Sequence, residues 1–205
     1  MKARRKKILV LAQYVLLAVG LSALGYCAIT IVAAKHYQAW AREQTRNGGS
    51  EPVALSPSSS EAVSRPRRLL SDNGMPVIGR VDIPRLHISV MLAQGTSAQA
   101  LRVAAGHIPG TALPGQPGNV VIAAHRDTFF RRLGELKSGD VIRLTVPGKQ
   151  YVYGVRFTDV VNPNETWVLE PSSNQSLTLV TCYPFYYVGP APKRFVVRAR
   201  RMDRD

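Results

Sequence analysis

The segment Leu177-Thr-Leu-Val-Thr-Cys-Tyr183, followed at once by Pro184, has the alternating pattern of a short β-strand. Because side chains alternate along a strand, the two leucines and Thr181 fall on one face and Cys182 falls on the other. Proline has no backbone N–H and ends a hydrogen-bonded ladder. One of the two cysteines in the chain therefore lies where a strand ends.

Short runs of the same kind recur between turn residues over residues 75–205. Pro-Gly and Ser-Gly pairs separate them, and helical periodicity is scarce. The predicted strands are 77–83, 88–92, 119–124, 140–146, 150–161, 177–182 and 194–200, with helical turns at 98–104 and 129–136. This pattern predicts a mostly β domain: a single closed or nearly closed β-barrel of seven to eight strands with short helices.

An apolar segment without charged residues precedes this domain at residues 8–34. As a helix it would be about 40 Å long, at roughly 1.5 Å per residue, which is enough to cross a bilayer. Five basic residues stand before it, so the positive-inside rule keeps the N-terminus in the cytoplasm and exports the rest. A cleaved signal peptide is the alternative, but the run exceeds the usual apolar core of about 7–15 residues.

The remaining organisation follows from composition. Residues 35–46 could continue the helix for a few turns, whereas residues 47–74 are rich in Gly, Ser and Pro and have the character of a spacer. We expect a cytoplasmic basic segment at 1–7, a transmembrane signal anchor at 8–34, an extracytoplasmic linker at 35–74 and the β domain at 75–205. The net charge of +14 divides equally between residues 1–74 and 75–205, which suits an anionic membrane or cell wall. No nucleic-acid motif accompanies it, so no nucleic-acid partner is expected.

Cys27 lies in the apolar segment, so Cys182 is expected to be a free thiol in an exported domain. It is either a buried apolar residue or a nucleophile, and a nucleophilic thiolate needs a basic partner. His107 lies in a turn-rich stretch, where a histidine commonly bonds backbone groups. His125 follows a buried apolar run and, like Cys182, stands at a strand exit, so we favour His125 as the partner.

Arg194 is a third candidate site residue, because of its expected place in a hairpin. If strands 177–182 and 194–200 pair antiparallel through the connection 183–193, Arg194 faces Cys182. A guanidinium at this point could donate hydrogen bonds to a developing oxyanion or to a substrate backbone. A solvated surface arginine is the alternative, since the domain holds 16 basic residues.

These segments resemble a known family. Thr178-Leu-Val-Thr-Cys182 matches the TLxTC signature of sortases, the membrane-anchored cysteine transpeptidases of bacterial surfaces. Ala124-His-Arg-Asp127 is similar to the sortase histidine segment, and Lys193-Arg-Phe-Val-Val197 to the strand with the sortase arginine. The resemblance covers residues 76–201. Within the family, residues 106–115 and 182–194 are most similar to class D sortases.

The resemblance implies a sortase-like catalytic barrel at 75–205 with Cys182, His125 and Arg194 as catalytic residues. Cys182 would attack the threonine carbonyl of a Leu-Pro-x-Thr-Gly (LPxTG)-like sorting signal on an exported protein. Arg194 would hold the oxyanion, and His125 would protonate the departing amine. An amino group of peptidoglycan or of a surface protein would then resolve the thioester. The protein would be a single-pass membrane protein with its catalytic domain outside the cell.

Three neighbours receive smaller roles from the same resemblance. Thr181 helps to position substrate or oxyanion, or else simply packs in its strand. Asp127 orients His125, or else caps a turn. Trp167 lies in the loop 162–176, which faces substrate by family analogy, although the indole could equally belong to the core.

Other protein classes fit less well. A class C, pilin-polymerising sortase usually has a lid motif and a second membrane helix, neither of which is found in this sequence. L,D-transpeptidases carry a different cysteine signature, and in papain-like proteases the cysteine precedes the histidine. A non-enzymatic, membrane-tethered binding barrel remains the rival from another functional class. No metal or cofactor is expected, because the His and Cys residues lack ligand spacing and no glycine-rich nucleotide motif occurs.

Overall fold

The structure is a computed structural model that describes residues 2–47, 69–70 and 76–202. The chain divides into two compact units, residues 1–36 and 37–205, which we describe separately. Helix α1 spans Lys2–Asn47, and its part Leu11–His36 is long and apolar enough to cross a membrane by length and composition. Most of the predicted linker, residues 48–68 and 71–74, lies outside the described residues, as does the predicted domain start at residue 75.

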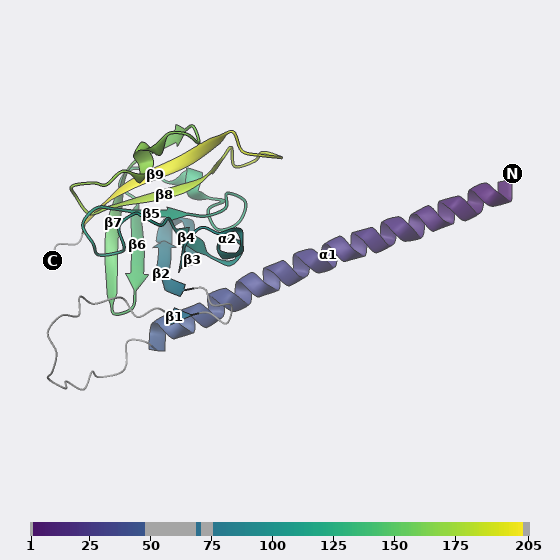
Figure 1. Ribbon diagram of the computed structural model, residues 1–205, viewed down its shortest axis with the longest axis horizontal. Helices are drawn as coiled ribbons and strands as arrows, with labels where there is room; N and C mark the ends of the chain where they lie inside the picture. Colours follow the sequence, from purple (N-terminus) through teal and green to yellow (C-terminus); the bar gives the residue numbers. More distant parts are fainter. Residues whose placement is uncertain (1, 48–68, 71–75, 203–205) are drawn as a thin grey trace. The chain divides into compact units, whose positions relative to one another are not determined.

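The second unit is built from β-strands, which Figure 1 labels in chain order. They are β1 (Leu69–Leu70), β2 (Pro76–Ile83), β3 (Ile88–Gln94), β4 (Ala105–His107), β5 (Asn119–Ala123), β6 (Val141–Val146), β7 (Lys149–Val161), β8 (Ser176–Tyr183) and β9 (Lys193–Arg201). The short helices are α2 (Ala98–Val103), η1 (Pro84–Leu86), η2 (Leu133–Glu135) and η3 (Thr166–Leu169).

The strands form one sheet in the order β1-β2-β3-β4-β5-β8-β9-β7-β6, and an additional β2–β6 pairing closes it. Strands β2 to β9 therefore make a closed eight-stranded barrel, which confirms the predicted fold class. The pairs β3–β4 and β5–β8 are parallel and the other pairs are antiparallel, so the barrel is mixed.

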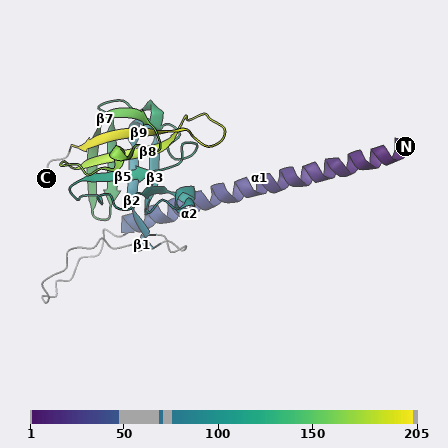
Figure 2. The ribbon, with the colours of Figure 1, turned by 45° about the horizontal axis from the view of Figure 1, so that its top comes forward.

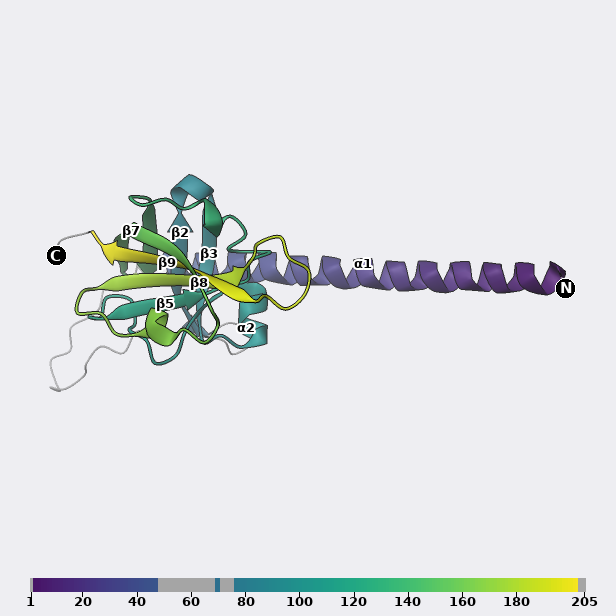
Figure 3. The same ribbon diagram turned by 90° about the horizontal axis from the view of Figure 1, so that it is seen from above.

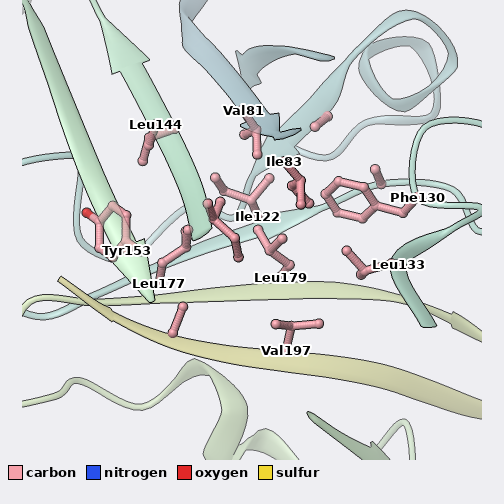
Figure 4. Close-up of a cluster of buried hydrophobic side chains, with 14 of the residues drawn as sticks. Val81, Ile83, Ile122, Phe130, Leu133, Leu144, Tyr153, Leu177, Leu179 and Val197 are labelled. Atoms are coloured by element: carbon pink, nitrogen blue, oxygen red, sulfur yellow. The ribbon is translucent and has the colours of Figure 1, made fainter. Parts of the chain in front are cut away.

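The barrel interior holds the apolar core. Figure 4 shows side chains from β2, β5, β6, β7, β8 and β9 converging on it. Leu177 and Leu179 of β8 are fully buried there, as the alternation of the strand predicts. Burying each leucine contributes about 1.5–3 kcal/mol before entropy costs. Because these two leucines point into the core, Cys182 lies on the outer face of β8, which is turned away from the core.

Three neighbouring strands position the candidate site residues. β8 lies between β5 and β9, as the views in Figures 2 and 3 agree. Because β5 runs parallel to β8 and β9 runs antiparallel to it, the ends of β5 and β8 and the beginning of β9 meet at one edge of the barrel. Residues that follow β5, end β8 and begin β9 are thus brought together from distant parts of the sequence.

Candidate active site

These strands bring the three predicted catalytic residues to one end of the barrel. Ala123 of β5 pairs with Val180 of β8 and the Ala124 N–H donates to the Val180 carbonyl, so His125 follows β5 at the end of the barrel where Cys182 lies. Cys182 pairs directly with Arg194 of β9, as the hairpin argument predicted. Directly paired residues of neighbouring strands share one face of a sheet. We call His125, Cys182 and Arg194 the reactive row.

The backbone around His125 is held on both sides. The Thr181 hydroxyl, on a side chain only 3% exposed, donates a hydrogen bond of 2.7 Å to the carbonyl of Ala124. The Ala124 N–H donates to the carbonyl of Val180, and the Phe130 N–H donates to that of His125. Since the Ala124 carbonyl belongs to the peptide that leads into His125, Thr181 fixes the histidine backbone while its imidazole stays exposed.

Cys182 is a partly exposed, free thiol. Next to it, the same outer face continues with Ala123 and Val180, which are also partly exposed. Val196 pairs with Val180 and packs against Val168 of η3. The thiol therefore stands at the end of an apolar strip that has η3 along its side.

Arg194 is partly buried, and its guanidinium bonds the chain that precedes β9. Nη1 donates to the carbonyl of Ala191 at 3.2 Å and to that of Lys193 at 2.9 Å. A guanidinium has five N–H donors in a rigid fork. These two bonds use one of its nitrogens and thus orient the fork without employing the other two.

The other predicted site residues have distinct surroundings. Trp167 of η3 is partly buried, stacks on Phe157 with ring centroids 6.5 Å apart, and donates its indole N–H to Glu165. Hydrogen bonds from the backbone N–H of Asn162, the indole of Trp167 and the side chain of Asn162 lower the pKa of the Glu165 carboxyl. Asp127 is exposed, so its action on His125 stays a prediction, as does substrate contact by Trp167 or Thr181.

A buried asparagine that the sequence reasoning missed anchors η3 to the strands. Asn119, 2% exposed, donates through Nδ2 to the carbonyls of Val168 and Glu170 and accepts at Oδ1 from the hydroxyls of Ser176 and Thr178. Arg198 adds a bond from Nη1 to the Thr178 hydroxyl, and burial lowers its pKa. The available signal in the sequence was an asparagine at the start of an apolar strand. Its hydrogen-bond partners could not be predicted, because they lie 49 to 59 residues further along the chain.

His107 lies apart from the reactive row. It belongs to β4 and pairs with Ile122 of β5, so its side chain lies on the face of the sheet opposite to that of Ala123. The imidazole is 1% exposed, and Nε2 lies 2.9 Å from the carbonyl of Ala112, so Nε2 carries the proton and donates. Burial lowers the pKa of His107, and its Nδ1 has no partner among the described residues. His107 is therefore a neutral structural residue.

A cavity of about 350 Å³ opens beside the segment that follows His125. Its walls come from η1 and β3 on one side and from residues 128–132 on the other. No member of the reactive row lines this cavity. The cavity is therefore distinct from the strand ends that carry Cys182 and Arg194.

Comparison with known proteins agrees with this arrangement. The Sortase domain family matches residues 81–202. Sortase D of Bacillus subtilis is 36% identical over 125 residues, which is 60% of this chain and 63% of that protein, so the chain spans less than two thirds of its length.

Two solved structures are similar as well. Sortase D5 transpeptidase of Clostridium perfringens is 29% identical with a TM-score of 0.57, covering 62% of this chain and 79% of that one. Sortase C of the same organism, solved with the C-terminal cell wall sorting motif, is 34% identical with a TM-score of 0.57, covering 62% and 71%. The barrel, the order of the three motifs and these similarities lead to one conclusion: the chain belongs to the sortase family, and its similarity to Sortase D agrees with the predicted resemblance to class D sortases.

Proposed function

We propose that this sortase is a membrane-anchored cysteine transpeptidase that cleaves an LPxTG-like sorting signal and joins the substrate to an amino group. The observation that carries the proposal is the arrangement of the reactive row: Cys182 pairs directly with Arg194, and His125 follows the end of the adjacent parallel strand β5. Sequence separation of more than 50 residues between His125 and Cys182 makes this arrangement informative. In the proposed reaction, Cys182 is the nucleophile, His125 the acid and Arg194 the oxyanion donor.

The reaction has two acyl-transfer steps. In the first, the Cys182 thiolate attacks the threonine carbonyl of the signal, the Arg194 guanidinium donates to the oxyanion, and the imidazolium of His125 gives its proton to the departing glycine amine. The product is a thioester on Cys182. In the second, neutral His125 takes a proton from the incoming amine as its nitrogen attacks the thioester, and the thiolate is released. The protons balance over the two steps.

We propose the apolar strip beside the thiol as the binding site of the sorting signal. Ala123 and Val180 are partly exposed next to Cys182, while η3 and Trp167 border the same face. An extended peptide with leucine and proline side chains matches an apolar surface of this kind better than a charged one. Thr181, through its bond to Ala124, keeps His125 at the end of this surface.

The membrane segment supports the proposed location. With Leu11–His36 in the bilayer and the N-terminal basic residues in the cytoplasm, the barrel would act outside the cell on exported proteins. The proposed acceptor is an amine of peptidoglycan or of another surface protein. We retain the predicted arrangement of basic segment 1–7, anchor 8–34, linker 35–74 and catalytic domain 75–205 as part of this proposal.

The test uses full-length protein in detergent with a quenched LPxTG-type peptide library and added amines. Mass spectrometry follows cleavage and ligation for the wild type and for the variants Cys182→Ala, His125→Ala and Arg194→Ala. His87→Asn, a change at an exposed histidine outside the row, is the matched control. Amine-dependent ligation that is lost in the three row variants and kept in the control supports the proposal.

Other results separate the alternatives. Covalent polymers formed when a pilin-like protein serves as both substrate and acceptor would indicate a class C-like activity. Absence of cleavage across the library, together with a Cys182 that resists alkylation in folded protein, would indicate the membrane-tethered binding barrel instead.

A further inference from the structure

The loop 184–192 joins β8 to β9; it begins two residues after Cys182 and ends two residues before Arg194. It projects beyond the strand ends, as Figures 1 and 3 show. Its tip is exposed: Tyr186 is 85% and Val188 is 99% accessible to solvent. A loop in this position, with apolar side chains in water, needs contacts elsewhere to keep one conformation.

Arg126, the residue directly after His125, provides such contacts. Its Nη1 donates to the carbonyl of Pro184 at 2.9 Å, and its Nη2 donates to the carbonyls of Tyr187 and Gly189 at 2.9 and 3.0 Å. The guanidinium carbon also lies 5.7 Å from the centre of the Tyr187 ring. One side chain thus holds the loop by three carbonyls, two of which flank its tip.

The other end of the loop is the part that orients Arg194. The Arg194 guanidinium donates to the carbonyl of Ala191, near the end of the same loop, and to that of Lys193, the first residue of β9. Two arginines therefore donate hydrogen bonds to carbonyls of this one loop. Arg126 does so from the segment that follows β5, and Arg194 does so from the reactive row. The position of Arg194 depends on where the loop places the Ala191 carbonyl.

We infer that Arg126 is a positioning residue, which holds the β8–β9 loop so that Arg194 faces the oxyanion next to Cys182. The inference rests on the proposed function for the role of Arg194, but the fixing of the loop is independent of it. The fork geometry is essential, because a lysine ammonium carries the same charge but cannot span carbonyls 184, 187 and 189. Lysine at this position should therefore behave like alanine.

The experiment is a double-mutant cycle on full-length protein in detergent with the variants Arg126→Ala, Arg194→Ala and the double variant. Arg126→Ala should lower kcat about 10- to 100-fold with KM within about 3-fold, since misplacing a catalytic group by about 1 Å costs up to about 100-fold. In the Arg194→Ala background the same change should cost less than about 3-fold. Arg126→Lys should fall near Arg126→Ala.

Arg143→Ala is the matched control. Arg143 is exposed on β6, which pairs with neither β8 nor β9, so its removal should change kcat less than about 2-fold. Hydrogen exchange of residues 184–193 gives a readout without substrate: uptake should rise in the Arg126 variants and stay at the wild-type level in the control. Arg126→Gln replaces Arg126→Ala if the alanine variant does not fold.

Two results would overturn the inference. Independent effects of Arg126 and Arg194 in the cycle would show that Arg126 does not act through Arg194, and wild-type rates in Arg126→Lys would show that charge alone suffices. If the wild type cleaves no sorting peptide, the proposed function fails, yet hydrogen exchange still decides the loop contact. Unchanged uptake in Arg126→Ala would then refute it.

Discussion

Thr181→Val tests how the barrel supports its histidine. Valine has nearly the shape of threonine but no hydroxyl, so the substitution removes the 2.7 Å bond to the Ala124 carbonyl and leaves that buried group without this donor. An unsatisfied buried carbonyl costs about 1–3 kcal/mol, and the valine methyl offsets part of this loss. We expect the free energy of unfolding to fall by about 1–2 kcal/mol.

The loss should appear in both stability and catalysis. For a domain of this size, the unfolding temperature should fall on the order of 3–10 °C. Because the freed carbonyl belongs to the peptide leading into His125, kcat for sorting-peptide ligation should also fall, roughly 10-fold, with little change in KM.

Thr181→Ser separates the two effects. Serine keeps the hydroxyl and loses one methyl group, so it should cost about 1 kcal/mol of stability but leave kcat within about 2-fold of wild type. Thermal unfolding followed by tryptophan fluorescence, together with steady-state ligation rates, measures both quantities. Equal loss of kcat in the serine and valine variants, or wild-type kcat in the valine variant, would refute the reasoning.

Three further predictions concern the surroundings of the row. Asn119→Ala removes four hydrogen bonds and should lower the free energy of unfolding by about 2–4 kcal/mol and raise KM, because η3 loses its anchor; urea unfolding and peptide kinetics check both. Burial lowers the pKa of His107, so the unfolded chain binds its proton more readily; its stability contribution is complete above about pH 6.5 and is lost as pH falls toward the folded pKa. Below about pH 6.5, the free energy of unfolding of the wild type should therefore fall by up to about 1.4 kcal/mol per pH unit more than that of His107→Phe, and parallel pH profiles would contradict this. Trp167→Ala should raise KM for the sorting peptide about 5- to 10-fold with kcat within about 2-fold, whereas Trp167→Phe should keep most of the affinity by preserving the stack on Phe157; a pure kcat effect in peptide kinetics would contradict a binding role.

Much of the barrel is predictable because alternation and turn residues are local signals. The strands of residues 77–83 and 177–182 and the hairpin that pairs Cys182 with Arg194 follow from them, and the structure contains all three. β4 was missed because three residues, Ala105–His107, are too few to show a pattern.

The supporting contacts of the site are not local and could not be predicted. The parallel β5–β8 pairing joins segments 57 residues apart, and only this pairing brings the Thr181 hydroxyl to the Ala124 carbonyl. Asn119 and Arg126 likewise act on groups 49 to 63 residues away. A sequence pattern indicates that such residues are polar, but it does not indicate what they hold.

The central claim is that Cys182 carries the acyl group, and intact-protein mass spectrometry tests it most directly. Full-length protein mixed with an LPxTG-type peptide without added amine should gain the mass of the peptide through its threonine. The adduct should map to Cys182, disappear on addition of an amine and be absent from Cys182→Ala. Peptide cleavage that persists in Cys182→Ala, or ligation by the wild type without any such adduct, would contradict the account.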